Sequence, residues 1–173
     1  MNLRKIDKFQ MDDSIRLALK EDITFEDIST NAIYKNDRLA EISLYSKEEG
    51  ILAGLDVFKR VFELLDNSVE FKEYKKDGDR LLNKDLILKI RANVKTILSA
   101  ERTALNYLQR MSGIATYTRK MVEALDDKNI FLLDTRKTTP NMRIFEKYAV
   151  RVGGGYNHRY NLSDAIMLKD NHI

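Results

Sequence analysis

The chain has 173 residues, 43% of them hydrophobic, which is enough for the core of one compact domain or of two small ones. Its net charge is only +3 and no basic-aromatic pattern accompanies it, so we do not expect nucleic acid as a partner. Cysteine is absent, which excludes disulfides, thiolate metal sites and a cysteine nucleophile. No apolar run approaches the length of a membrane span, and residues 1–10 lack the hydrophobic stretch of a signal peptide. We therefore predict a cytoplasmic protein with no membrane partner.

Hydrophobic periodicity in the first hundred residues predicts helices that cover one face of a sheet. Residues 55–66 place Leu55, Phe58 and Phe62 on one helical stripe, whereas residues 86–94 alternate apolar and polar side chains like a half-buried strand. The other predicted elements are a helix at 12–20 capped by Asp12 or Asp13, an acidic loop at 21–30, strands at 39–46 and 69–74, and an Asp-Gly turn at 75–80. We predict an open α+β sandwich as the first domain, residues 1–108.

The second half of the chain alternates helices and short apolar runs. The predicted elements are a helix at 96–111 capped by Thr96, a helix at 114–126, a strand at 130–134, a helix at 141–149, a glycine turn at 153–155 and a strand at 165–169. This alternation predicts the first strands of an α/β barrel as a second domain, residues 109–173. A complete barrel needs roughly 200 residues or more, so we expect the barrel to be incomplete and the chain to be a fragment.

Cations lie where the predicted strands end. Arg136 and Lys137 follow the strand at 130–134, and Lys169 ends the strand at 165–169. The carboxyl ends of parallel strands share one crevice, so these side chains are expected to converge. His158 and Arg159 follow the three glycines, which allow a tight turn or a close approach to a ligand. A ligand with several negative charges is expected, and the alternative is a solvated basic surface.

Three further cations are expected to face solvent. On the predicted helix at 141–149 and just after it, Arg143, Lys147 and Arg151 fit exposed positions.

Several motifs carry a resemblance that covers nearly the whole chain. They are TRKTTP at 135–140, EKYAVRVGGGYNHR at 146–159, KDNH at 169–172 and AERTALN at 100–106. In this order and spacing they resemble the quinolinate phosphoribosyltransferases (nicotinate-nucleotide pyrophosphorylases, carboxylating), over the N-terminal two-thirds of such an enzyme. One departure is Asn141-Met142, where the family usually has Gly-Leu. Asparagine tolerates positive φ better than other non-glycine residues, so we expect the turn to persist.

The resemblance implies a reaction in NAD biosynthesis. Quinolinate and phosphoribosyl pyrophosphate give nicotinate mononucleotide, pyrophosphate and carbon dioxide. Both substrates are polyanions, and their assembly requires positive charge fixed in advance. Mg²⁺ is implied as the cofactor, bound with phosphoribosyl pyrophosphate. The family's acidic residues and phosphate loops lie further along its chains, so little activity is expected from these 173 residues alone.

The resemblance also assigns roles to residues of this sequence. The substrate-binding residues are Arg136, His158, Arg159 and Lys169, with Arg102 supplied by a partner subunit. Lys137 faces phosphoribosyl pyrophosphate, and Lys137 and Lys169 are the implied catalytic residues. His172, from its place at the end of the sequence, is interpreted as a structural residue or as one that supports the substrate-binding residues. A homodimer or higher homo-oligomer with a shared active site follows from the role of Arg102.

Two alternative functions stay open at this point. One is a related phosphoribosyltransferase of a molybdenum-transport-associated pathway, and the other is a non-catalytic fragment that dimerises. The intact group Arg136, Arg159 and Lys169 favours a dicarboxylate substrate. We expect the ends of these three side chains within about 10 Å of one another, a Debye length at moderate salt.

Overall fold

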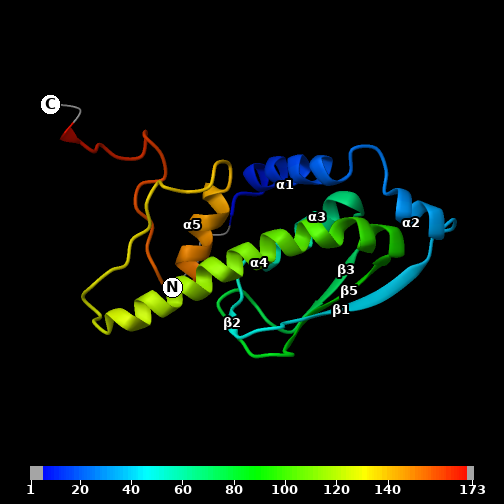
Figure 1. Cartoon of the computed structure of the whole chain (residues 1–173), viewed down its shortest axis with the longest axis horizontal. Helices are drawn as coiled ribbons and strands as arrows, with labels where there is room; N and C mark the ends of the chain where they lie inside the picture. The colour runs from blue at the N-terminus through cyan, green and yellow to red at the C-terminus, as the bar shows by residue number, and fades with distance from the viewer. Residues whose placement is uncertain (1–5, 171–173) are drawn as a thin grey trace.

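A helical layer lies against a small antiparallel sheet in the computed structural model, which describes residues 6–170 (Figure 1). The helices are α1 (Lys8–Asp22), α2 (Ile28–Ile33), α3 (Leu55–Leu65), α4 (Val94–Leu125) and α5 (Arg143–Val152). The strands are β1 (Leu39–Tyr45), β2 (Gly50–Ile51), β3 (Glu70–Glu73), β4 (Arg80–Leu81) and β5 (Leu86–Asn93). The fold is therefore α+β. None of the described helices is long and apolar enough to cross a bilayer.

The main sheet has the order β1-β5-β3, and both of its pairings are antiparallel. Ile42 of β1 lies opposite Ile90 of β5, on the face that packs against the helices. The other face is polar, and Lys89 donates to Glu41 across the strands at 2.9 Å. Because side chains alternate between the two faces of a strand, the period of two in the sequence located all three strands. The predictions at 39–46, 69–74 and 86–94 are confirmed.

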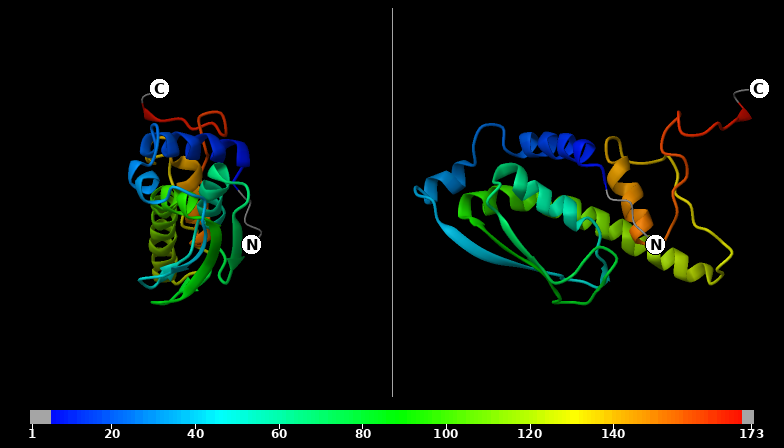
Figure 2. Two further views of the ribbon diagram at one scale, coloured as in Figure 1. Left: turned by 90° about the vertical axis from the view of Figure 1, so that its right-hand side faces the viewer. Right: turned by 180° about the vertical axis from the view of Figure 1, so that it is seen from behind.

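Helices α3 and α4 pack side by side over the sheet, and α1 packs on their far side (Figures 1 and 2). The core contains Phe58 and Phe62 of α3 and Met111 of α4. The helix predicted at 55–66 is confirmed.

The two helices predicted at 96–111 and 114–126 are one helix, α4, so this prediction was wrong. Gly113 lies inside it, and a glycine in a helix costs about 1 kcal/mol relative to alanine. Burial of Leu108, Met111 and Ala115 on the same stripe outweighs that cost. Helix α4 therefore runs through the boundary predicted near residue 108, and the two-domain division stays a prediction.

Three helix starts differ from the prediction. Helix α1 begins at Lys8, and Asp7 caps it in place of Asp12 or Asp13 by accepting from the amide of Phe9 at 3.0 Å. Asn93 caps α4 in place of Thr96. Helix α2 occupies the end of the predicted loop 21–30. In each case a short polar side chain just before the helix accepts hydrogen bonds from the free amides of its first turn. Hydrophobic periodicity does not reveal the position of such a cap.

The predicted strands of the second half are only partly formed. Residues 130–134 contribute a single parallel bridge, between Leu133 and Tyr156. Residues 165–169 form no strand, so that prediction was wrong. Strands are held by hydrogen bonds to a neighbour, and Ile166 is instead 94% exposed. No closed barrel is present in the described residues.

An ion pair that joins α1 to α3 predicts an acid-dependent loss of stability. Arg60 donates to Asp12 through Nε and Nη2, both at 2.7 Å, and these hydrogen bonds hold the pKa of Asp12 below its ordinary value. A carboxyl with a lowered folded-state pKa stabilises the fold above its unfolded pKa and loses this contribution as the pH falls through the folded value. Arg60→Met should therefore lower the free energy of unfolding by about 1 kcal/mol near neutral pH and by much less at about pH 2.

Urea denaturation at the two pH values measures this difference. Lys89→Met, which removes the exposed pair with Glu41, is the matched control and should change stability much less, because water and salt screen an exposed pair. A deficit of Arg60→Met that is the same at both pH values would contradict the prediction.

Candidate functional site

Two loops leave the molecule from the same edge. Leu133 and Tyr156 pair in parallel, with the amide of Asp134 donating to the carbonyl of Tyr156 at 3.0 Å and the amide of Tyr156 to that of Leu132 at 2.8 Å. The segments after this pair, residues 134–142 and 157–160, therefore start side by side. We call them the first and the second loop. They carry Arg136, Lys137, His158 and Arg159.

The glycine turn sets the second loop against α4. A Cβ on Gly153 would lie 2.5 Å from the carbonyl oxygen of Ala115 and 2.6 Å from Cβ of Thr118, so only glycine fits. Arg119 of α4 donates from Nε to the carbonyl of Gly153 at 2.9 Å. Gly154 has φ of +98°, a conformation that favours glycine. The tight turn and close approach expected from the three glycines are confirmed.

Lys147 of α5 contacts both loops and connects them. Its Nζ lies 2.5 Å from Oδ1 of Asp134 and donates to the carbonyl of His158 at 3.0 Å, and the amide of His158 donates to the same carboxylate oxygen at 2.8 Å. In the flipped orientation of its amide, Asn157 donates to Oδ2 of Asp134 at 3.0 Å. Lys147 is only 2% exposed. The prediction that it faces solvent was wrong, because the loops cover the side of α5 that points away from the core.

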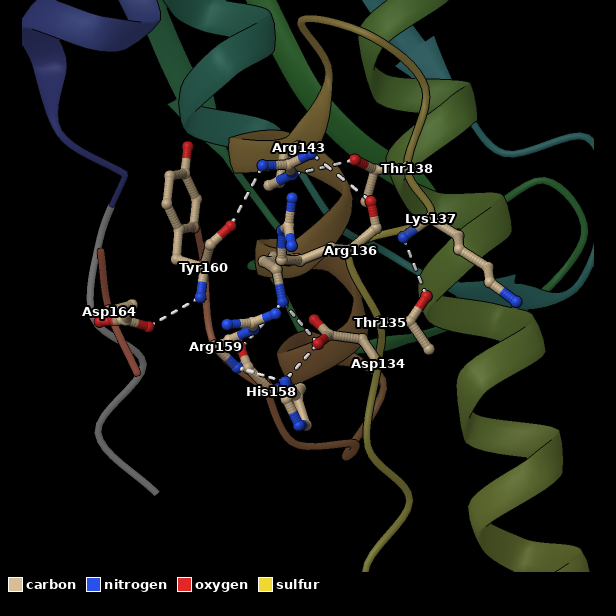
Figure 3. Close-up of polar contacts among 11 residues, drawn as sticks. Asp134, Thr135, Arg136, Lys137, Thr138, Arg143, His158, Arg159, Tyr160 and Asp164 are labelled. Carbon is tan, nitrogen blue, oxygen red and sulfur yellow. Dashed lines mark hydrogen bonds and ion pairs between the residues drawn. The ribbon is translucent and has the colours of Figure 1, made fainter. Parts of the chain in front are cut away.

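Arg143 makes a second connection between the loops. It donates from Nε to Oγ1 of Thr138 at 3.1 Å, from Nη1 to the carbonyl of Tyr160 at 3.2 Å and from Nη2 to the carbonyl of Arg136 at 3.4 Å (Figure 3). It is half-buried, and so the predicted exposed position was wrong here as well. Asn141 has φ of +64°, which confirms that it takes over the conformation of a glycine at this turn.

The first loop is also fixed to α4. Arg110 donates to Glu146 and to Oγ1 of Thr139, and the amide of Thr139 donates to Oε2 of Glu146 at 3.2 Å. Burial alone would raise the pKa of Glu146, but the hydrogen bonds from Arg110 and Thr139 outweigh it and hold this pKa below its ordinary value. Glu146 is therefore ionised and occupied by its partners at neutral pH.

Helix α5 is in turn anchored to the first half of the chain. Asp77 accepts from the amides of Gly54 and Leu55 and from the hydroxyl of Tyr148, at 2.9, 2.9 and 2.8 Å. Burial raises the pKa of Asp77, and the three hydrogen bonds oppose that rise. Arg151, the third cation predicted to be exposed, is half-buried and lies over the ring of Tyr148, which corrects that prediction too.

Arg136, His158 and Arg159 gather around Asp134 (Figure 3). The Nε atoms of both arginines are buried, and neither has a hydrogen-bond partner within the described part of the chain. Arg159 uses Nη1 to donate to the carbonyl of Ala165 at 2.7 Å. Nδ1 of His158 accepts from the amide of Arg159 at 2.8 Å, so Nε2 is the ring nitrogen that can donate to a ligand. The two loops thus present guanidinium and imidazole donors to a common region.

The other predicted site residues lie elsewhere. Lys137 is exposed, and its side chain points away from Arg136 and Arg159 (Figure 3). Lys169 is exposed, and the segment that carries it extends away from α5 (Figures 1 and 2). Arg102 is exposed on α4, about 12 Å along the helix axis before Arg110. His172 lies outside the described residues.

A small cavity adjoins the start of α5. It has a volume of about 290 Å³ and is lined by Thr138, Thr139, Asn141, Arg143, Ile144 and Tyr160. The described residues contain no group of three or more His, Asp or Glu side chains that could hold a metal ion. The arrangement is suited to binding an anion through fixed cationic and amide donors.

Sequence reasoning missed the residues that hold the loops. Asp134 and Lys147 form the buried pair, and Arg110 fixes the first loop through Glu146. The one available signal was position: Asp134 lies two residues before the cations of the first loop, where an unpaired acid would weaken anion binding.

Comparison with known proteins gives consistent matches. The model of the quinolinate phosphoribosyl transferase N-terminal domain matches residues 27–112, and that of the C-terminal domain matches residues 114–173. A Bacillus subtilis protein named probable nicotinate-nucleotide pyrophosphorylase (carboxylating) is 49% identical over 88% of this chain and 53% of its own length. A Nicotiana tabacum protein named quinolinate phosphoribosyltransferase (decarboxylating) 2b, mitochondrial, is 39% identical over 95% of this chain and 47% of its own.

Solved structures agree with these matches. The crystal structure of NadC from Streptococcus pyogenes is 58% identical, with a TM-score of 0.95, and the match covers 98% of this chain and 60% of that one. The nicotinate-nucleotide pyrophosphorylase of Francisella tularensis is 38% identical with a TM-score of 0.93, over 100% of this chain and 61% of that one. The chain spans about half the length of the curated relatives it matches.

Proposed function

Because the chain belongs to the quinolinate phosphoribosyltransferase family, we propose that it supplies the dicarboxylate-binding part of an enzyme that makes nicotinate mononucleotide. The substrates are quinolinate and phosphoribosyl pyrophosphate, and the other products are pyrophosphate and carbon dioxide. The observation that carries the proposal is the pair Arg136 and Arg159, whose buried Nε atoms have no partner within the described residues. Buried donors without partners are costly, and a carboxylate that reaches these two guanidinium groups would offset that cost.

The two loops would bind the pyridine dicarboxylate from one side. A guanidinium fork suits a carboxylate because it can donate two parallel hydrogen bonds. Arg136 and Arg159 would each take a carboxylate oxygen pair, and Nε2 of His158 would donate a further hydrogen bond. Lys169 would join them when the segment that carries it folds back over the site. The chemistry then depends on orientation, since the ring nitrogen attacks C1 of the ribose and the resulting pyridinium stabilises the carbanion left by decarboxylation.

Lys137 would serve the second substrate. Its exposed side chain points to the opposite side of the first loop from Arg136, which separates a site for phosphoribosyl pyrophosphate from the site for the dicarboxylate (Figure 3). As a point charge, a lysine can follow the negative charge that builds on the departing pyrophosphate.

The described residues do not provide a Mg²⁺ site of their own. Asp134 is occupied by Lys147 and Glu146 by Arg110, and no cluster of three possible ligands is present among residues 6–170. We propose that Mg²⁺ arrives bound to phosphoribosyl pyrophosphate, and the ion belongs in the assay for that reason.

The position of Arg102 supports a shared active site. It is exposed on α4, about 12 Å before the contact that Arg110 makes with the first loop, so it is placed to serve another subunit better than its own. We propose a homodimer or higher homo-oligomer on this ground. The parallel bridge between Leu133 and Tyr156 would be the start of a barrel sheet. The cytoplasmic location stays a prediction from the sequence.

The test is formation of nicotinate mononucleotide from quinolinate, phosphoribosyl pyrophosphate and Mg²⁺, with the mass of the assayed protein measured alongside. Because the match covers only about half of the curated relatives, we expect the 173-residue chain to bind quinolinate, and a longer protein that includes this sequence and has the relatives' full length to turn over. Lys137→Ala in that protein should reduce turnover by roughly 100-fold, since loss of one group that stabilises the developing charge costs about 3 kcal/mol. Failure of both proteins to bind quinolinate would contradict the proposal.

A further inference from the structure

Two carboxylates border the loops, and each is paired with a cation that a helix supplies. Glu146 pairs with Arg110 of α4 at the first loop. Asp134 pairs with Lys147 of α5 where the two loops meet, and both side chains of this second pair are nearly excluded from water. The acids next to the proposed site are thus neutralised by residues outside it.

Arg136 and Arg159, by contrast, form no ion pair with any of the described residues, although Asp134 is close to both along the backbone. Asp134 is two residues from Arg136, and it accepts from the amide of His158, the neighbour of Arg159. A carboxylate at this position without its own cation would attract a guanidinium group strongly, because water cannot screen charges in a buried environment.

We propose that Lys147 is a positioning residue that neutralises Asp134 and so keeps the guanidinium groups of Arg136 and Arg159 available for the dicarboxylate. This inference rests on the proposed function for its ligand, whereas the competition between Lys147 and the arginines for Asp134 is a property of the free protein. Without Lys147, Asp134 becomes an internal competitor of quinolinate. With it, the substrate meets two arginines that have no carboxylate to release.

A purely structural role for Lys147 makes a different prediction. If the ion pair only holds the loops together, K147M should weaken binding by loosening the loops, and the arginine groups should not respond to Asp134. An uncompensated buried carboxylate destabilises the fold by itself, so recovery of binding in K147M/D134N agrees with both roles. The variants K147M and K147M/D134N separate the roles when binding is measured together with the state of the Arg136 and Arg159 guanidinium groups, which changes only if Asp134 competes for them.

The first measurement is quinolinate affinity by calorimetry, on the 173-residue chain and on the longer protein. We expect K147M to bind about 10-fold more weakly or worse than the unmodified chain, and K147M/D134N to return to within about threefold of it. K147R keeps the charge and should also bind within about threefold. K89M, which removes an exposed ion pair on the sheet, is the matched control and should bind unchanged. A double variant as weak as K147M would overturn the proposal.

The second measurement needs no ligand and observes the arginine Nε–H groups by ¹⁵N NMR. We expect K147M to shift at least one of the Arg136 and Arg159 signals and to slow its exchange with water, and K147M/D134N to reverse both changes. Unchanged signals in K147M would overturn the proposal. If K147M does not fold, the double variant decides, because it buries no charge: full binding supports the proposal and weak binding refutes it. If even the unmodified protein binds no quinolinate, the proposed function fails, and the NMR result still decides whether Lys147 competes for Asp134.

Discussion

Arg159→Ala is expected to weaken quinolinate binding by roughly 100-fold. A hydrogen bond to a charged group contributes up to about 3 kcal/mol, and about 1.4 kcal/mol corresponds to a factor of ten in affinity. Arg159 already has its Nε buried without a partner among the described residues, so the cost of desolvating this donor is met before the ligand arrives. Calorimetry with quinolinate measures the loss.

Two controls define what the loss means. Arg159→Lys keeps the charge without the planar fork, so its affinity for quinolinate should lie between those of the unmodified chain and Arg159→Ala, at about a tenfold loss. Arg91→Ala removes an exposed arginine on the sheet, paired with Glu70, and should leave binding unchanged. If Arg159→Ala binds within about threefold of the unmodified chain, Arg159 is not a ligand of the dicarboxylate.

The same variant tests the shared site. In a preparation that forms nicotinate mononucleotide, Arg102→Ala and Arg159→Ala should each be inactive. Equal mixing after reassembly should recover about a quarter of the activity, because half of the dimers are mixed and each mixed dimer has one intact site of two. Absence of recovery, with mixed dimers shown to form, would place Arg102 outside the site.

Gly153→Ala should have the largest effect on stability. The backbone of Gly153 is in the right-handed helical region, at φ of −68° and ψ of −11°, so the conformation itself accepts alanine. The cost comes from the added methyl group, which would lie 2.5 Å from the carbonyl oxygen of Ala115 and 2.6 Å from Cβ of Thr118. One contact is with backbone inside α4, which cannot move without disturbing the helix. We expect the free energy of unfolding to fall by about 3 kcal/mol, at the upper end for overpacking.

Gly113→Ala is the matched control, because it is the same substitution on the neighbouring helix. Nothing lies within 4 Å of a Cβ at Gly113, and this residue is helical. Alanine should therefore stabilise the chain by about 0.5–1 kcal/mol. Urea denaturation of the two variants should give changes of opposite sign. A loss of less than about 1 kcal/mol for Gly153→Ala would mean that α4 and α5 can separate at little cost.

The sandwich could be read from the sequence because its elements each bury one face. In β5, Leu88, Ile90 and Ala92 alternate with Lys89 and Arg91, and the period of two appears directly in the sequence. The continuity of α4 was harder to predict. Ser112-Gly113 looks like a break between two helices, yet packing outweighs the low helix propensity of these residues and α4 continues through them.

Helix α5 shows why the rest could not be predicted. Phe145, Ala149 and Val152 form the buried stripe that periodicity detects. Lys147 lies on the opposite side of the helix, and periodicity assigns that side to solvent. It is buried because two loops cover it, and the contact with Asp134 depends on how these loops fold in three dimensions. The cations of the site were visible as residue types near turns, whereas the pair that organises them was visible only in the structure.

The pairing of β1 with β5 also has a consequence for synthesis of the chain. Leu39 of β1 lies opposite Asn93, so the central strand of the sheet is made roughly fifty residues after its first neighbour. At 5–20 residues per second, a ribosome needs about 3–10 s to bridge that interval. During this time the apolar side chains of Ile42 and Leu44 have no strand beside them, and α4, which covers the same face, is still unmade. Nascent chains that contain β1 but not β5 are therefore the ones on which a chaperone would act.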